Sequence, residues 1–170
     1  MTKIAVYAGT FDPISNGHLD IARRAAVLFD EVIIAVAVDN YKHTLFNSEE
    51  RCALAREATK RSPNIRVESF SGLLVEYCRR VGATSIIRGL RAVSDFDREF
   101  QMALLNRNLH GGLDSVFLMS DAAYLYISSS IIRNTAAAGG DVSHLVPPCV
   151  NAALRSRIDE WRRRSAGEAR

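Results

Sequence analysis

The sequence has few cysteines, no long apolar run and no strong excess of charge. Its 170 residues include only Cys52, Cys78 and Cys149, with no CxxC pair, so neither a disulfide framework nor a zinc site is expected. The longest uninterrupted apolar run is 32–38, far shorter than a membrane-spanning helix. The chain also enters an apolar strand pattern at once, without the charged-then-apolar pattern of a signal peptide. We therefore expect a cytoplasmic protein that does not bind membranes.

The net charge is small, and its positive part gathers near the end of the chain. The formal net charge is +3. The clustered arginines are Arg155, Arg157, Arg162, Arg163, Arg164 and Arg170. A nucleic-acid-binding protein more often carries its basic face within the folded body, so we expect no nucleic-acid partner. The length fits one domain, which we place at residues 1–161, followed by a disordered basic tail at 162–170.

Three familiar motifs are missing, and each absence removes a class of chemistry. The sequence contains no GxxxxGK[ST] P-loop, and no GxGxxG follows its first strand pattern. P-loop hydrolysis and dinucleotide redox chemistry thereby lose their main support. A GxSxG elbow is also lacking, which disfavours a serine nucleophile.

Strand and helix patterns alternate along the whole chain. Strands are predicted over 3–8, 31–38, 64–70, 84–87 and 115–119, and helices over 17–29, 47–60, 73–81, 94–109, 128–138 and from Pro148 onward. This alternation predicts an α/β fold, a single-domain, doubly wound, five-stranded parallel sheet of the Rossmann-like kind. In such open sheets ligands bind beyond the carboxyl ends of the strands, so the turns after the strands should form one site.

The helical patterns carry local expectations of their own. Cys52 and Cys78 should pack as small hydrophobes, and Gly82 should cap the helix before it. One face of the 94–109 helix should carry Phe96, Phe100, Ala103 and Leu104, and the last helix should bury Val150, Ala153, Leu154, Ile158 and Trp161. Asp12, before Pro13, is expected to be a turn former.

The segment 9–18, GTFDPISNGH, is the most informative stretch. It joins the first strand to the first helix and places His18 in the first helical turn. Unpaired N–H groups and the helix dipole favour anions there, so His18 can donate to a phosphate oxygen. Thr10 adds a hydroxyl and a backbone N–H at the same turn.

Further phosphate-binding groups follow other strands of the predicted sheet. Lys42, Arg88 and Arg91 are cations in turns after strands, and Ser128-Ser129-Ser130 opens another helix. Gly89 permits a close approach of backbone to ligand. Transfer of a phosphorus group needs positioning and charge neutralisation more than covalent help from the protein. The set therefore predicts chemistry at a nucleotide phosphate.

Taken together, these motifs resemble bacterial phosphopantetheine adenylyltransferases. The resemblance rests on GTFDPxxxGH at 9–18, Lys42, IRGLRA at 87–92, SDFDREFQMALLNRN at 94–108 and ISSSIIR at 127–133. It covers the chain to about residue 160. It implies that the protein joins 4′-phosphopantetheine to the AMP part of ATP, giving dephospho-coenzyme A and pyrophosphate. It also implies Mg²⁺, a homohexamer and competition by coenzyme A.

The resemblance implies a role for each matching residue. His18 would stabilise the transition state at the α-phosphate, and Thr10 would orient the attacking phosphate. Lys42 and Arg88 would bind the phosphate of the acceptor substrate, and Leu74 its pantetheine arm. The ATP-binding positions would be Thr10, Phe11, His18, Gly89, Leu90, Arg91, Glu99, Tyr124, Leu125, Tyr126, Ile127, Ser128, Ser129 and Ser130. No protein residue is expected to bind the metal, which ATP oxygens and water would hold.

Two alternatives stay open. The same fold could use another acceptor, such as nicotinate mononucleotide or a cytidylyl-transfer substrate, although Lys42 and the 88–91 block disfavour this. A non-catalytic adenine-nucleotide sensor would bind ATP without turnover. A panel of acceptors in a pyrophosphate-release assay distinguishes all three.

Overall fold

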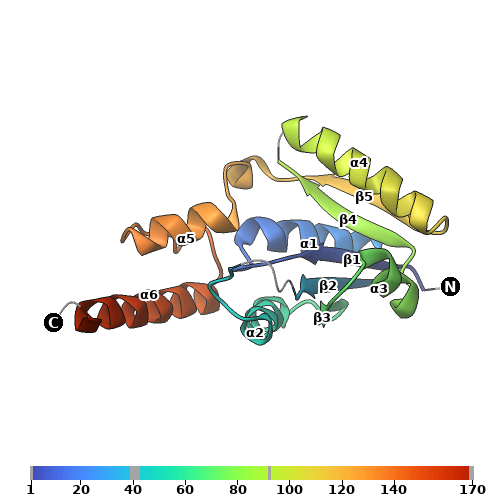
Figure 1. Ribbon diagram of the computed structural model, residues 1–170. Helices are drawn as coiled ribbons and strands as arrows, with labels where there is room; N and C mark the ends of the chain where they lie inside the picture. Colours follow the sequence, from blue (N-terminus) through green and yellow to red (C-terminus); the bar gives the residue numbers. More distant parts are fainter. Residues whose placement is uncertain (1, 39–42, 92, 169–170) are drawn as a thin grey trace.

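Five parallel strands form one sheet at the centre of the protein (Figure 1). The computed structural model describes residues 2–38, 43–91 and 93–168. The strands are β1 (Ile4–Gly9), β2 (Glu31–Ala37), β3 (Ile65–Phe70), β4 (Ser85–Leu90) and β5 (Asp114–Met119), in the order β3-β2-β1-β4-β5. Their parallel registers confirm the predicted five-stranded parallel sheet.

Helices connect the strands, as the alternating pattern predicts. They are α1 (Asn16–Leu28), α2 (Ser48–Thr59), α3 (Leu74–Val81), α4 (Val93–Leu109), α5 (Ser129–Ala137) and α6 (Pro148–Glu168), with a short 3-10 turn η1 at Ala122–Tyr124. The chain builds outward from β1 to β3, then crosses back to place β4 on the other side of β1. The crevice for a ligand is expected at this switch point, between the carboxyl ends of β1 and β4.

The sheet has a hydrophobic core on each face. One core joins alternate residues of β1 and β2 to α1, α2, α5 and α6, and the other joins the intervening residues to α3. This alternation follows from the two-residue period of a strand. Cys52 lies in the first core and Cys78 in the second, both buried, which confirms that they pack as small hydrophobes.

Helix boundaries follow the capping signals of the sequence. The Asn47 side chain accepts from the Glu50 N–H at 2.9 Å, and Glu50 accepts from the Asn47 N–H at 2.8 Å, which closes a capping box. Gly82 ends α3 in the left-handed conformation, at φ 68°, as predicted. β4 extends to Leu90, three residues beyond the predicted strand, so Arg88 and Gly89 belong to the strand end.

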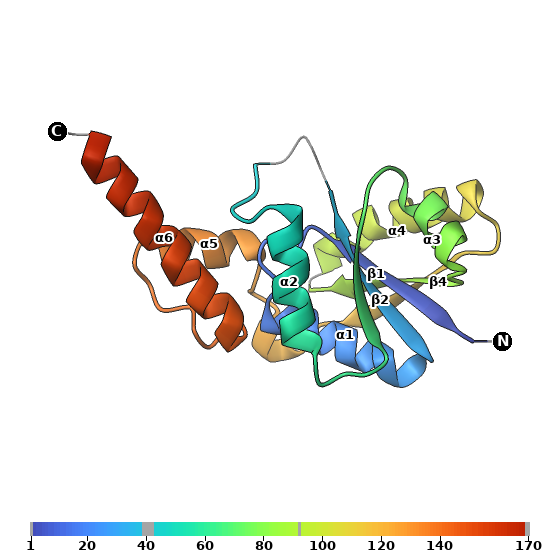
Figure 2. The same cartoon turned by 90° about the horizontal axis from the view of Figure 1, so that it is seen from below.

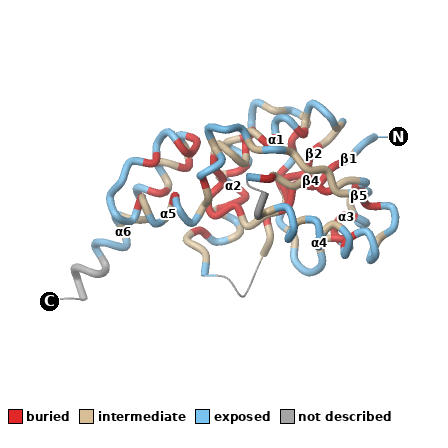
Figure 3. Tube along the Cα trace, turned by 90° about the horizontal axis from the view of Figure 1, so that it is seen from above, coloured by how far each residue is buried: buried red, intermediate tan, exposed pale blue. Residues whose placement is uncertain are grey.

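Helices α5 and α6 pack together beyond the carboxyl edge of the sheet (Figures 1 and 2). Val150 and Leu154 are buried as predicted, but Trp161 is 61% exposed, so its predicted burial is wrong. By that point α6 has left the sheet, and residues 161–163 are exposed (Figure 3). The helix continues to Glu168, past residue 161, where we placed the end of the domain.

Helix α4 presents apolar side chains to solvent. Phe96 and Phe100 stack with ring centroids 5.6 Å apart and are 42% and 46% exposed. The other exposed apolar residues of this helix are Met102, Leu104, Leu105 and Leu109. Patches of this kind mark interaction surfaces.

Within the described residues, no helix combines the length and apolarity needed to cross a membrane.

Candidate active site

The turn after β1 leads directly into α1, and Ser15 and His18 close its first turn together. The Ser15 side chain accepts from the His18 N–H at 3.4 Å. In return, the Ser15 N–H donates to Nδ1 of the His18 ring at 3.1 Å. This is the geometry of a capping box, with histidine in the place usually taken by glutamate or glutamine.

Aromatic rings hold the other side of His18. The Phe11 ring meets it edge-on, with centroids 5.1 Å apart, and the Tyr7 ring lies 6.4 Å away. Burial and, to a smaller extent, the positive charge of Arg91 lower the pKa of His18 to about 4. The ring is therefore neutral near pH 7. Burial also raises the pKa of the Tyr7 hydroxyl, against the opposing effect of Arg88 and Arg91, so Tyr7 stays protonated.

A cavity of about 220 Å³ opens beside His18 at the predicted crevice. It collects groups from the ends of β1 and β4 and from the starts of α1 and α5. Its lining includes Tyr7, Ser15, Gly17, His18, Arg88, Gly89, Arg91, Glu99, Ser120, Tyr124, Ile127, Ser128 and Ser129. Two arginines and two helix N-termini on one cavity make it complementary to a polyanion.

Arg88, Arg91 and Glu99 form one side of this cavity, which we call the open rim. Arg88 Nε lies 3.0 Å from Glu99 Oε2, yet this buried oxygen accepts no hydrogen bond from the described residues. Arg91 donates to the Ile127 carbonyl at 3.2 Å and lies 3.4 Å from Asp95. Because a guanidinium group has five N–H donors, both arginines can still donate to an incoming phosphate.

The start of α5 supplies the opposite wall. Ser128 caps the helix, accepting from the Ile131 N–H at 3.2 Å, and Ser129 donates to the Pro13 carbonyl at 2.9 Å. This last contact fixes α5 against the β1 turn. Gly17 completes the packing, because a Cβ there would lie only 3.1 Å from Tyr124 Cβ. Glycine lets the first turn of α1 approach Tyr124 this closely without a shift of the neighbouring side chain.

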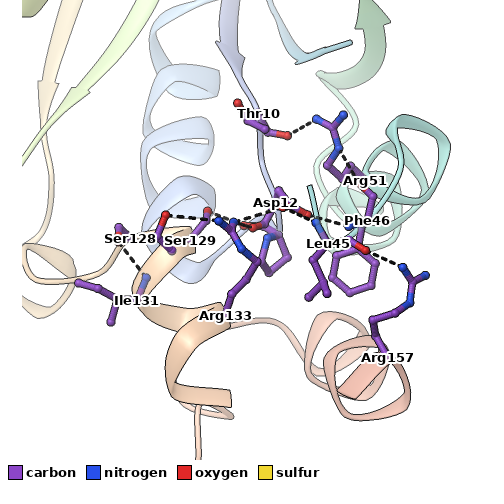
Figure 4. Close-up of polar contacts among 12 residues, drawn as sticks. Thr10, Asp12, Leu45, Phe46, Arg51, Ser128, Ser129, Ile131, Arg133 and Arg157 are labelled. Carbon is purple, nitrogen blue, oxygen red and sulfur yellow. Dashed lines mark hydrogen bonds and ion pairs between the residues drawn. The ribbon is translucent and has the colours of Figure 1, made fainter. Parts of the chain in front are cut away.

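A second cavity, of about 380 Å³, adjoins the first at Ser129. It is lined by Thr10, Asp12, His43, Thr44, Ser129, Ser130 and Arg133. The Asp12 carboxylate is buried beside it and accepts from the Leu45 and Phe46 N–H groups at 2.8 and 2.9 Å (Figure 4). Arg133 pairs with the same carboxylate at 3.2 Å and also donates to the Asp12 carbonyl. Asp12 therefore joins the β1 turn to both the segment 44–46 and α5.

Two further arginines fix the segment 44–46. Arg51 is buried and donates to the carbonyls of Phe46 at 3.1 Å, Thr10 at 2.5 Å and Ala37 at 3.0 Å (Figure 4). Arg157 of α6 donates to the Leu45 carbonyl at 2.5 Å, pairs with Glu50 and stacks over the Phe46 ring. We call Asp12, Arg51, Arg133 and the segment 44–46 the paired rim, because their polar groups bond to one another.

The structure brings together most of the residues that the sequence singled out. His18, Arg88, Gly89, Arg91, Glu99, Tyr124, Ile127, Ser128 and Ser129 line the first cavity, and Thr10 and Ser130 line the second. Phe11 and Leu90 are buried, whereas Leu125 and Tyr126 are exposed. Leu74 lies at the start of α3, against the second core. Lys42 lies outside the described residues.

Sequence reasoning missed the paired rim. Asp12 was expected only to form a turn, and Arg133 was quoted in a motif without a role. Arg51 lies within the predicted helix 47–60, and no role was expected for it. The pattern SxxH at 15–18 could have identified Ser15 as the cap of the first helix. The position of Asp12 within the phosphate-binding turn could have suggested that its carboxylate is buried and holds the turn in place.

Comparisons with known proteins agree with this geometry. Residues 6–135 match the family model described as cytidylyltransferase-like. The chain is 56% identical over 155 residues to a phosphopantetheine adenylyltransferase of Moorella thermoacetica, covering 91% of this chain and 97% of the relative. It is 53% identical over 152 residues to one of Herpetosiphon aurantiacus, covering 89% and 92%.

A solved structure shares the fold. It is described as a putative nicotinate-nucleotide adenylyltransferase from Vibrio parahaemolyticus, with a TM-score of 0.67 and 21% identity, over 91% of this chain and 99% of that one. The two chains therefore share one fold, and the family model identifies that fold as cytidylyltransferase-like. On the sequence matches, the chain belongs to the phosphopantetheine adenylyltransferase family.

Proposed function

We propose that the protein transfers the adenylyl group of ATP to 4′-phosphopantetheine, giving dephospho-coenzyme A and pyrophosphate. The observation that carries this is the cavity between the ends of β1 and β4, where His18, two arginines and the start of α5 converge. A phosphate oxygen of the acceptor attacks the α-phosphorus in line, and the bond to the β-phosphate oxygen breaks. No protein nucleophile takes part.

The two sides of the site divide the charges of the reaction. Arg88, with Lys42, binds the acceptor phosphate, while Thr10 orients it. Gly89, Arg91, Glu99 and the segment 124–130 hold ATP, with the pyrophosphate leaving near the N–H groups that begin α5. His18 donates to the α-phosphate oxygen as charge builds up in the transition state. Leu74 contacts the pantetheine arm.

We propose that Mg²⁺ enters with ATP, held by phosphate oxygens and water. Among the described residues that line the two cavities, each carboxylate already faces an arginine: Glu99 lies against Arg88, and Asp12 lies against Arg133. When bound, the ion neutralises the phosphates of ATP, while the protein supplies the arginines and the helix starts.

The exposed face of α4 supports a homo-oligomer, for which we propose the hexamer that the resemblance implies. Packing the Phe96–Phe100 stack against a second copy would remove a large apolar patch from water. Coenzyme A carries the same pantetheine arm and an adenylate, so we propose that it competes for the site. The cytoplasmic location expected from the sequence stays a prediction.

The deciding experiment mixes the protein with ATP, Mg²⁺ and 4′-phosphopantetheine and measures dephospho-coenzyme A together with pyrophosphate. Nicotinate mononucleotide and a cytidylyl acceptor with CTP serve as the comparison. Turnover with another acceptor alone would overturn the proposal, and ATP binding without any turnover would favour the sensor. His18→Ala tests the role of His18, with an expected fall in kcat on the order of 100-fold or more.

A further inference from the structure

The two nitrogens of the His18 ring lie in different surroundings. Nδ1 receives the Ser15 backbone N–H at 3.1 Å and lies 3.0 Å from the Ser15 hydroxyl oxygen. A backbone N–H can only donate, so Nδ1 must present its lone pair to Ser15. The hydroxyl then also donates to Nδ1, while its oxygen accepts from the His18 N–H at 3.4 Å.

It follows that the proton of the neutral ring resides on Nε2. That nitrogen makes no hydrogen bond to any described residue, and His18 lines the first cavity. The edge-on contact with Phe11, at an interplanar angle of 81°, limits rotation of the ring. Ser15 thereby sets both the tautomer and the direction of the remaining N–H.

The surroundings also disfavour a second proton on the ring. A proton on Nδ1 would face the Ser15 N–H. Arg88 and Arg91 share the cavity with His18, and the start of α1 carries the positive end of the helix dipole. Glu99 is the acidic residue of the lining, and it already lies against Arg88.

We propose that Ser15 is a positioning residue that holds His18 as the neutral Nε2–H tautomer, so that His18 meets the reacting phosphate as an uncharged hydrogen-bond donor. The ring then neither gives up nor takes a proton during the reaction. This inference rests on the proposed function for the identity of the phosphate, but the tautomer belongs to the resting protein. His18 donates a hydrogen bond but keeps its proton. It is therefore neither a general acid, which would transfer the proton, nor a cation.

Long-range ¹H–¹⁵N NMR of the labelled protein without substrate tests the tautomer directly. His18→Gln identifies the His18 signals among the four histidines of the chain. At pH 7 we expect an unprotonated Nδ1 and a protonated Nε2. A proton on Nδ1, alone or with one on Nε2, overturns the inference, whichever acceptor the enzyme uses.

Substitutions at Ser15 test the positioning role in the same spectra. Ser15→Ala removes the hydroxyl donor, and Ser15→Thr keeps it. One neutral hydrogen bond contributes about 0.5–1.5 kcal/mol, which corresponds to about 0.5–1 pH unit in the protonation midpoint of His18. We expect the midpoint to rise by that amount in Ser15→Ala and to stay in Ser15→Thr. An unchanged midpoint in Ser15→Ala contradicts the role of the hydroxyl.

Two amide substitutions show which ring nitrogen of His18 supplies the hydrogen bond in catalysis. His18→Gln places an amide N–H near the position of Nε2, and His18→Asn places one near Nδ1. Losing a donor to a developing charge costs about 10²–10³ in kcat, so His18→Gln should retain at least about tenfold more kcat than His18→Asn. Equal kcat values for the two variants would overturn the donor role, while the NMR result would still report the tautomer.

Discussion

The paired rim and the open rim of the site each contain an arginine–carboxylate pair. The two carboxylates differ in how many hydrogen bonds they accept. The Asp12 carboxylate receives two backbone N–H groups in addition to Arg133. The buried Glu99 oxygen has only the Arg88 guanidinium beside it and accepts no hydrogen bond from the described residues. A completed pair fixes structure, whereas an incomplete one retains bonding capacity for a ligand.

His18 stands at the border of the two rims. Its Nδ1 bonds to Ser15, and the residue lines the first cavity. The comparison therefore predicts that changes to the paired rim reduce stability, and that changes to the open rim reduce activity. Four measurements probe this division, in order of decreasing expected effect.

Removing the carboxylate of the paired rim should have the largest effect. Asp12→Ala removes the carboxylate that Arg133 and two N–H groups share, and breaking a buried pair costs about 3–5 kcal/mol. We expect a loss of that size in the free energy of unfolding, measured in urea. Glu99→Gln is the matched change on the open rim, and it should cost less than about 1 kcal/mol. Equal losses would remove the distinction between the rims.

Changing the arginine of the open rim should mainly reduce turnover. Arg88→Gln removes the charge-assisted bond that we propose to the acceptor phosphate, and such a bond contributes about 1.5–3 kcal/mol. We expect kcat/KM for 4′-phosphopantetheine to fall about 10²-fold, with little change in the free energy of unfolding. Arg88→Lys keeps the charge but loses the planar guanidinium. Its kcat/KM should therefore lie between those of wild type and Arg88→Gln.

Arg133→Gln is the control for that experiment on the paired rim. It should lower the free energy of unfolding more than Arg88→Gln does. If Arg133→Gln instead lowers turnover and leaves unfolding unchanged, Arg133 belongs to the open rim.

The protonation of His18 should link pH to stability. Its pKa of about 4 in the fold lies below the ordinary 6.5, so between these values the unfolded chain binds a proton that the folded protein does not. The stabilisation is complete above pH 6.5 and is lost as pH falls toward 4. We expect wild type to lose about 2 kcal/mol more than His18→Gln between pH 7 and 4, less than the full shift because the ring is partly exposed. Parallel pH profiles would contradict the low pKa.

The cap of α1 should give the smallest effect. Ser15→Ala removes the side-chain acceptor for the His18 N–H, and loss of such a cap costs about 1 kcal/mol. The free energy of unfolding should fall by that amount in Ser15→Ala and stay within a few tenths of a kcal/mol in Ser15→Thr. A larger loss in Ser15→Thr would indicate that the methyl group, rather than the cap, decides stability here.

The sequence predicts the elements of the fold because their signals are local. The alternation of apolar strands with capped helices identified all five strands, and a capping signal such as 47–50 located a helix start to within a residue. Trp161 was placed wrongly because helical periodicity indicates a shared face but cannot show where the helix leaves the body of the protein.

The site was predictable to the extent that it follows the strand ends. His18, Arg88 and Arg91 were expected together because parallel strands bring their carboxyl ends to one edge, and they line one cavity. The paired rim was not predictable in this way. Arg133 and Arg157 reach their partners from helices beyond the sheet, and no local pattern encodes such distant contacts.

The separation of those contacts along the chain bears on how the site is assembled during synthesis. Arg133 lies 121 positions after Asp12, and Arg157 lies 112 positions after Leu45. The strand, turn and first helix that carry His18 leave the ribosome well before Arg133 and Arg157, which anchor the β1 turn and the segment 44–46. A nascent chain that has completed β1 to β5 still lacks the helices that secure the β1 turn. The β1 turn therefore gains its anchoring contacts only after α5 and α6 have been synthesised.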